Sequence, residues 1–118
     1  MSKILEIAST LFEDARNIEV IEKNVACITT HHLDHHNDYL QIYLIEEEKG
    51  YILTDDGWIL FDIQHLPTYD ENLKSIERIL QRLGIERNEN EIYVKTNLEN
   101  LAMAKDNLMQ AINALNEF

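Results

Sequence analysis

A short polar segment carries the residues of this chain that are best suited to bind a metal ion. Residues 30–38 contain four of the five histidines: His31, His32, His35 and His36. They form two pairs separated by four residues, the spacing that on a helix directs two imidazoles at one metal ion. The same segment contains two aspartates and an asparagine, which favour turns, so we expect a loop between two strands.

A second candidate group is the aspartate pair Asp55 and Asp56, which Gly57 follows. In a β-meander, this turn would lie at the same end of the sheet as the histidine loop. The two groups could then form a mixed imidazole–carboxylate site for zinc, manganese or iron. Three interpretations of the histidine loop stay open: this metal site, a solvated polar loop, and a partner-contacting loop whose charge changes with pH. For Asp55 and Asp56 themselves, the simplest role is a tight hairpin turn.

Other catalytic chemistries have no complete set of residues. The single cysteine, Cys27, lies in an apolar stretch, where a buried and inert thiol is the usual state. Three isolated glycines cannot build a phosphate-binding loop. The three serines, Ser2, Ser9 and Ser75, all lie in helical stretches of the sequence, and no serine–histidine–acid group can be assigned. We therefore expect no enzyme, with a metal-dependent enzyme as the alternative.

The negative charge is unevenly distributed. The net charge is −12, and residues 34–62 hold eight acidic residues against one lysine. Such a field repels nucleic acid and anionic membranes and attracts basic partners. We expect the partner-binding residues to be these acids together with polar and aromatic side chains of one strand: Asp34, Asp38, Tyr39, Gln41, Tyr43, Glu46, Glu47, Glu48, Asp55, Asp56 and Asp62.

The elements that must position these residues follow from apolar periodicity. Helices are expected over residues 3–16, 68–83 and 98–115, and strands over 25–30, 39–45, 51–54, 58–63 and 91–95. The expected fold is one α+β domain, residues 1–118, with an antiparallel β-meander sheet and helices on one face, in the order α-β-β-β-β-α-β-α. On this scheme Glu46 to Glu48, Asp62 and His65 lie at the end of the sheet opposite the histidine loop.

One expected strand carries a candidate binding surface of its own. Leu40, Ile42 and Leu44 alternate with the stripe Tyr39, Gln41 and Tyr43, so the two sets face opposite sides of the sheet. If the first set faces the helices, the stripe is open to a partner, since tyrosine combines apolar area with a hydroxyl. The alternative is that the last helix covers the stripe.

Several stretches of this chain resemble a known family. They are Ile28-Thr29-Thr30, Leu33-Asp34, Asn37-Asp38-Tyr39, Ile42-Tyr43 and the run Tyr51-Ile52-Leu53-Thr54-Asp55-Asp56-Gly57. The family is an uncharacterised one of bacteria and phages, the domain of unknown function numbered 1828, and the resemblance covers residues 25–115. His31 and His32 depart from it, because the family tends to have proline and an aromatic residue there. The resemblance implies a small protein often found near phages and mobile elements, and no activity.

These observations favour a non-enzymatic interaction protein of phage or mobile-element type. We expect an acidic inhibitor that mimics DNA toward a basic, nucleic-acid-binding host protein, as an anti-CRISPR protein does. The first alternative is a metal-binding domain or metal-dependent enzyme centred on residues 31–36 with Asp55 and Asp56. The second is a homodimer through the last helix, with Leu108, Met109, Ile112, Leu115 and Phe118. The chain shows no secretory or membrane segment, so we expect a cytoplasmic protein that binds neither membranes nor nucleic acid directly.

Overall fold

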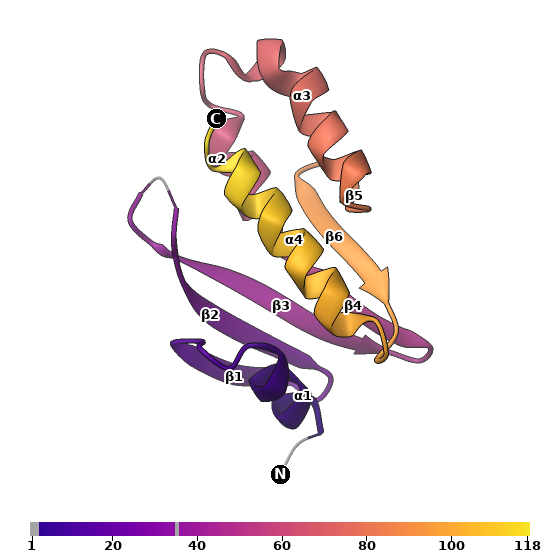
Figure 1. The fold of residues 1–118 in the computed structure, drawn as a ribbon. Coiled ribbons are helices and arrows are strands. Elements are labelled where there is room, and N and C mark those ends of the chain that lie inside the picture. Colours follow the sequence, from indigo (N-terminus) through magenta and orange to yellow (C-terminus); the bar gives the residue numbers. More distant parts are fainter. Residues whose placement is uncertain (1–2, 35) are drawn as a thin grey trace.

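The computed structural model describes residues 3–34 and 36–118, which form four helices and six strands (Figure 1). The helices are α1 (Lys3–Leu11), α2 (Trp58–Ile63), α3 (Tyr69–Arg82) and α4 (Leu101–Leu115). The strands are β1 (Asn17–Glu22), β2 (Val25–Leu33), β3 (Tyr39–Glu47), β4 (Gly50–Thr54), β5 (Glu86–Asn88) and β6 (Glu91–Thr96). None of the described helices is long and apolar enough to cross a membrane.

All six strands form one antiparallel sheet in the order β1-β2-β3-β4-β6-β5. The first four are neighbours in the chain, as in a meander. The chain then leaves the sheet through α2 and α3 and returns with the β5–β6 hairpin, whose second strand pairs with β4. The α+β class and the antiparallel sheet are confirmed. The order α-β-β-β-β-α-β-α is confirmed as well, with the consecutive helices α2 and α3 counted as one helical segment and the hairpin β5–β6 as one strand segment.

The core lies on one face of the sheet. Leu40, Ile42 and Leu44 of β3 are buried there, in one cluster with residues of α1 and α4. Figure 1 shows these two helices on the same face of the sheet. The last helix contributes Leu108, Ile112 and Leu115 to this core, and Met109 and Phe118 pack against it. The apolar residues considered for a dimer contact thus belong to the core of the chain itself.

The expected strand over residues 58–63 is wrong, because this segment is the helix α2. Its buried residues are Ile59, Leu60 and Ile63, and this spacing of one and then three residues fits one face of a helix. A strand would have placed Asp62 on the same face as Leu60. The carboxylate of Asp55 also caps the first turn of α2, so that the expected hairpin turn is instead the start of a helix.

Two strands were not expected, and the first helix is shorter than its apolar stripe indicates. β1 lies at one edge of the sheet and the three-residue β5 at the other. The first helix ends at Leu11, and the chain then turns into β1. The sheet is therefore wider than the sequence indicated.

Candidate functional site

An acidic pocket of about 240 Å³ lies where the β2–β3 loop, β3 and the start of α2 meet. The residues that line it are Asp34, Asp38, Tyr39, Gln41, Tyr43, Asp55, Asp56 and Trp58. All but Trp58 were expected at a binding surface. The antiparallel order explains the grouping, because the loop after β2 and the turn after β4 lie at the same end of the sheet.

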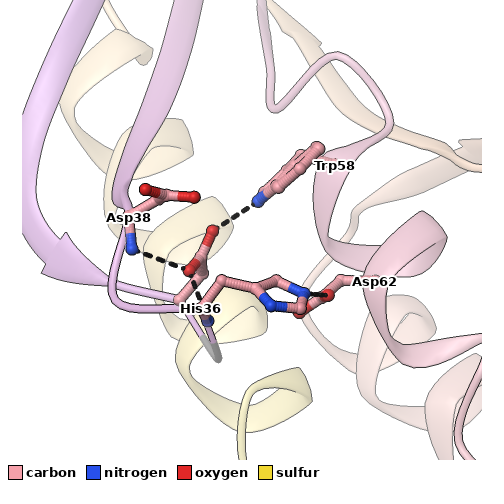
Figure 2. Close-up of polar contacts among 5 residues, drawn as sticks. His36, Asp38, Trp58 and Asp62 are labelled. Carbon is pink, nitrogen blue, oxygen red and sulfur yellow. Dashed lines mark hydrogen bonds and ion pairs between the residues drawn. The ribbon is translucent and has the colours of Figure 1, made fainter.

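Asp34 joins the β2–β3 loop to α2. Its Oδ1 accepts hydrogen bonds from the amides of His36 (2.8 Å) and Asp38 (3.0 Å), and its Oδ2 accepts one from the indole of Trp58 at 2.6 Å (Figure 2). Burial by itself raises the pKa of this carboxyl. The bonds from Trp58, Asp38 and His36 outweigh that effect, so the pKa lies below its ordinary value of 3.8. Asp34 is therefore held as a carboxylate on the pocket wall.

Asp55 lies at the base of the pocket, where its side chain starts α2. Its Oδ1 accepts the amide of Gly57 at 2.9 Å and its Oδ2 that of Ile59 at 2.8 Å. The residue is only 2% exposed, and burial raises its pKa to about 6 in spite of these bonds. Asp56 and Gly57 take positive φ angles of 60° and 86°, which turn the chain sharply from β4 into the helix.

Trp58 begins a strip of exposed aromatic side chains along α2. Trp58 is 40% exposed and Phe61 48%, although both are large apolar residues. Their rings stack with centroids 6.2 Å apart, and Phe61 meets the ring of His65 edge to face at 5.1 Å. We call Trp58, Phe61 and His65 the aromatic strip. The aromatic strip was not predicted, because residues 58–63 were expected to form a strand. The signal was present in the sequence, since Trp58, Phe61 and His65 are spaced by three and four residues, as on one face of a helix.

Two tyrosines of β3 complete the pocket wall. Tyr39 is 41% exposed, and the guanidinium of Arg16 lies 4.1 Å from its ring centroid. Tyr43 is half-buried, and burial raises the pKa of its hydroxyl. Both residues lie on the sheet face opposite Leu40, Ile42 and Leu44, so the last helix does not cover the expected stripe. The thiol of Cys27 beside Tyr43 is buried, which raises its pKa and fits an inert cysteine.

The histidines do not gather at this pocket. His31 and His32 line a separate groove of about 310 Å³ that α4 borders through Lys105 and Asp106. His36 points at α2, where its Nε2 lies 2.5 Å from Oδ1 of Asp62 (Figure 2). His35 lies outside the described residues.

No group of three metal-binding side chains is arranged around a common point in residues 3–34 and 36–118. We expected these histidines near Asp55 and Asp56. They do lie at the same end of the sheet as the aspartate pair. However, His31, His32 and His36 line other cavities, so the expectation of one shared site is wrong for these described residues. Metal binding through the whole histidine loop, with His35, stays a prediction.

The remaining expected acids divide between the two ends of the sheet. Glu47 pairs with Gly50 in the β3–β4 hairpin, at the end opposite the acidic pocket, as expected for Glu46 to Glu48. Glu46 there forms an ion pair with Lys3 at 3.7 Å. Asp62 was expected at that end too, and this is wrong. Because residues 58–63 form a helix, Asp62 stays beside the β2–β3 loop.

The model of a protein family, Domain of unknown function DUF1828, matches residues 30–115. The chain belongs to this family. Within the DUF1828 match lie all the residues of the acidic pocket and the aromatic strip, whereas α1 and β1 precede it. Searches of curated proteins and of solved structures found no match to this DUF1828 protein.

Proposed function

We propose that this protein is a non-enzymatic protein-binding domain whose acidic pocket receives a lysine or arginine side chain of a basic partner protein. The composition of the pocket carries the proposal: four aspartates and three aromatic residues line it, and none of its described lining residues is basic. Carboxylates pair with guanidinium or ammonium groups, and aromatic ring faces attract both cations.

No ion pair among the described residues neutralises a carboxylate of the pocket. The ion pairs of the described residues are Lys3–Glu46, Arg87–Glu77 and His36–Asp62, and none uses an aspartate of the pocket. Asp38 and Asp56 are exposed at the pocket mouth. Since Arg16 already stacks on Tyr39 at the rim, this surface suits guanidinium groups chemically.

The aromatic strip extends the same surface. Trp58 and Phe61 are exposed beside the pocket, and tryptophan, tyrosine and arginine are the residue types that most often dominate binding energy at protein interfaces. A partner that inserts a basic side chain into the pocket would cover the strip with neighbouring apolar groups. The pocket would then supply the orientation and the strip the apolar contact area.

One partner that would fit this chemistry is a DNA- or RNA-binding host enzyme, because its basic cleft presents lysine and arginine side chains. An inhibitor encoded by a phage or mobile element, of the anti-CRISPR type, is the form of the proposal that the sequence favours. Its acidic residues would compete with nucleic acid for the arginines and lysines of the cleft.

A binding experiment with two charge-matched variants tests the proposal. The probe is a hexa-arginine peptide, titrated into the protein by calorimetry at low salt. The variant Asp38→Asn/Asp56→Asn removes two carboxylates from the pocket mouth, and the control Glu47→Gln/Glu48→Gln removes two from the opposite end. We expect the first to lower the affinity at least about tenfold, a loss of about 1.4 kcal/mol, and the control to stay close to the native protein.

Equal losses in both variants would mean that the peptide senses only net charge, and the pocket would then have no special role. Absence of binding by the native protein at low salt would refute the proposal directly. The same peptide with lysine in place of arginine distinguishes bidentate guanidinium recognition from simple charge attraction, since only arginine binds a carboxylate with two parallel hydrogen bonds.

A further inference from the structure

We propose that the His36–Asp62 pair is a latch that fixes the β2–β3 loop against α2 and so keeps the acidic pocket in its binding shape. The inference rests on the proposed function, because it concerns what holds the same pocket together. Asp62 does not line that pocket. It acts through His36, as a positioning residue.

The loop needs such a latch because it supplies half of the pocket's carboxylates. Asp34 and Asp38 come from the loop, whereas Asp55 and Asp56 come from the chain that enters α2. Within the described residues, two hydrogen bonds or ion pairs between side chains connect the loop to α2 (Figure 2). These are the bond from Trp58 to Asp34 at 2.6 Å and the His36–Asp62 pair at 2.5 Å.

The surroundings of Asp62 indicate that its position is not optimised for stability. Its side chain is only 8% exposed, whereas that of His36 is 61% exposed. Oδ2 of Asp62 is buried and accepts no hydrogen bond from the described residues. A buried carboxylate oxygen without a donor destabilises a fold, so an apolar residue would suit this position of α2 better. His36 is the one described partner of Asp62, and departures from optimal packing of this kind are expected at functional positions.

A small cavity beside the pair gives the loop room to move. It has a volume of about 210 Å³ and is lined by His36, Asp62, His65 and Leu66. The exposed imidazole of His36 has no packing around most of its surface, so the pair itself must hold it. If the pair is broken, the Asp34–Trp58 bond is the one described hydrogen bond that still connects the loop to α2, and Asp34 and Asp38 lose their fixed distance from Asp55 and Asp56.

Trp58 reports on the latch without a label, because it is the only tryptophan of the chain and bonds directly to the loop. The experiment measures quenching of its fluorescence by acrylamide in the variants His36→Ala and Asp62→Leu. His32→Ala is the matched control, since His32 lies in the same part of the chain but lines another groove. We expect the quenching constant to rise about twofold in both latch variants, because the indole loses cover when the loop moves. It stays unchanged in the control.

The conservative variant Asp62→Asn separates a latch from a general effect on α2. Asparagine keeps an acceptor for the imidazole. The acrylamide quenching constant of this variant should therefore equal that of the native protein or lie between the native and Asp62→Leu values. Affinity for the hexa-arginine peptide should fall about tenfold in His36→Ala and Asp62→Leu, although neither residue lines the pocket.

A quenching constant of His36→Ala equal to the native value would overturn the latch proposal. A quenching constant that rises in Asp62→Leu but not in His36→Ala would overturn it as well. Should Asp62→Leu fail to fold by circular dichroism, His36→Ala still decides, because it truncates an exposed side chain. If the native protein does not bind the peptide, the proposed function fails, whereas the quenching comparison still tests the latch.

Discussion

Asp34 and Asp55 are both buried beside the acidic pocket, yet their carboxyl groups differ in pKa. Asp34 receives a short bond from the Trp58 indole in addition to two amides, and its pKa is lowered. Asp55 is more deeply buried and receives amides of its own turn and of β6, so burial dominates and its pKa rises to about 6. The pocket thus contains one carboxylate that is firmly ionised and one that gains a proton in mildly acidic solution.

The raised pKa of Asp55 predicts a specific pH dependence of stability. Between 3.8, its ordinary value, and about 6 the folded protein binds this proton more strongly than the unfolded chain does. The contribution of Asp55 to the free energy of unfolding therefore falls as pH rises through this interval, by about 3 kcal/mol in total. Asp55→Asn carries no charge and keeps an acceptor for one of the two amides.

The measurement is urea unfolding of the native protein and the variant at about pH 4 and about pH 7. We expect the stability of Asp55→Asn relative to the native protein to be higher at the upper pH than at the lower one. Asp56→Asn, at the exposed neighbouring position, is the control for removing a carboxylate from the same turn. A pH-independent difference between native and Asp55→Asn would show that folding does not raise the pKa of Asp55.

At the scale of elements, strict alternation of apolar and polar residues predicted a strand correctly, whereas a continuous apolar run was assigned to the wrong type of element. The pattern of Tyr39 to Ile45 alternates strictly, and β3 forms there with the expected faces. Trp58 to Ile63 is almost wholly apolar, and such a run fits a buried strand and a short helix equally well. What decides is Asp55, whose carboxylate caps the helix. Asn17 to Val20 alternates as well, and β1 forms there with Ile18 and Val20 half-buried, although no strand was expected in this stretch.

The pairing of β4 with β6 could not be foreseen, because α2 and α3 separate the two strands in the chain. It brings the backbones so close that a Cβ on Gly50 would lie 2.4 Å from the carbonyl oxygen of Thr96. Gly50→Ala should therefore destabilise the protein by about 2 kcal/mol, because the clash is with backbone and the strands must separate to relieve it.

Thermal unfolding of Gly50→Ala against Lys49→Ala measures this effect. Lys49 is exposed in the same hairpin, so its truncation should change the midpoint little. A midpoint for Gly50→Ala equal to that of the control would mean that β4 and β6 lie further apart than described. The loss should appear as reduced stability and leave binding by the folded protein intact, because the acidic pocket lies at the other end of β4.

At the scale of the whole molecule, the acids do not form the single surface that the sequence suggested. The molecule measures 46 × 29 × 20 Å, and the acids of residues 34–62 divide between the two ends of the sheet. Topology predicted that Asp34, Asp38, Asp55 and Asp56 would meet, because meander loops alternate between sheet ends. The position of Asp62 and of the aromatic strip depended on α2, which the sequence reading missed. The proposed recognition by the pocket therefore requires one basic side chain of the partner, and a long basic surface is not required.

The net charge of −12 predicts opposite effects of salt on folding and on binding. Few acids are paired with bases among the described residues, so like charges repel in the folded state more than in the expanded chain. Raising the ionic strength from about 0.01 M to about 0.15 M shortens the Debye length from about 30 Å to about 8 Å, which screens this repulsion. The free energy of unfolding in urea should rise by about 1 kcal/mol, whereas the affinity for hexa-arginine should fall over the same range.

The variant Glu47→Lys/Glu48→Lys is the control, because it lowers the net negative charge far from the pocket. The stability of this variant should depend less on salt than that of the native protein, while its peptide binding should keep the native salt dependence. Stability that falls as salt is added would mean that attractive charge pairs outweigh the repulsion among the acids.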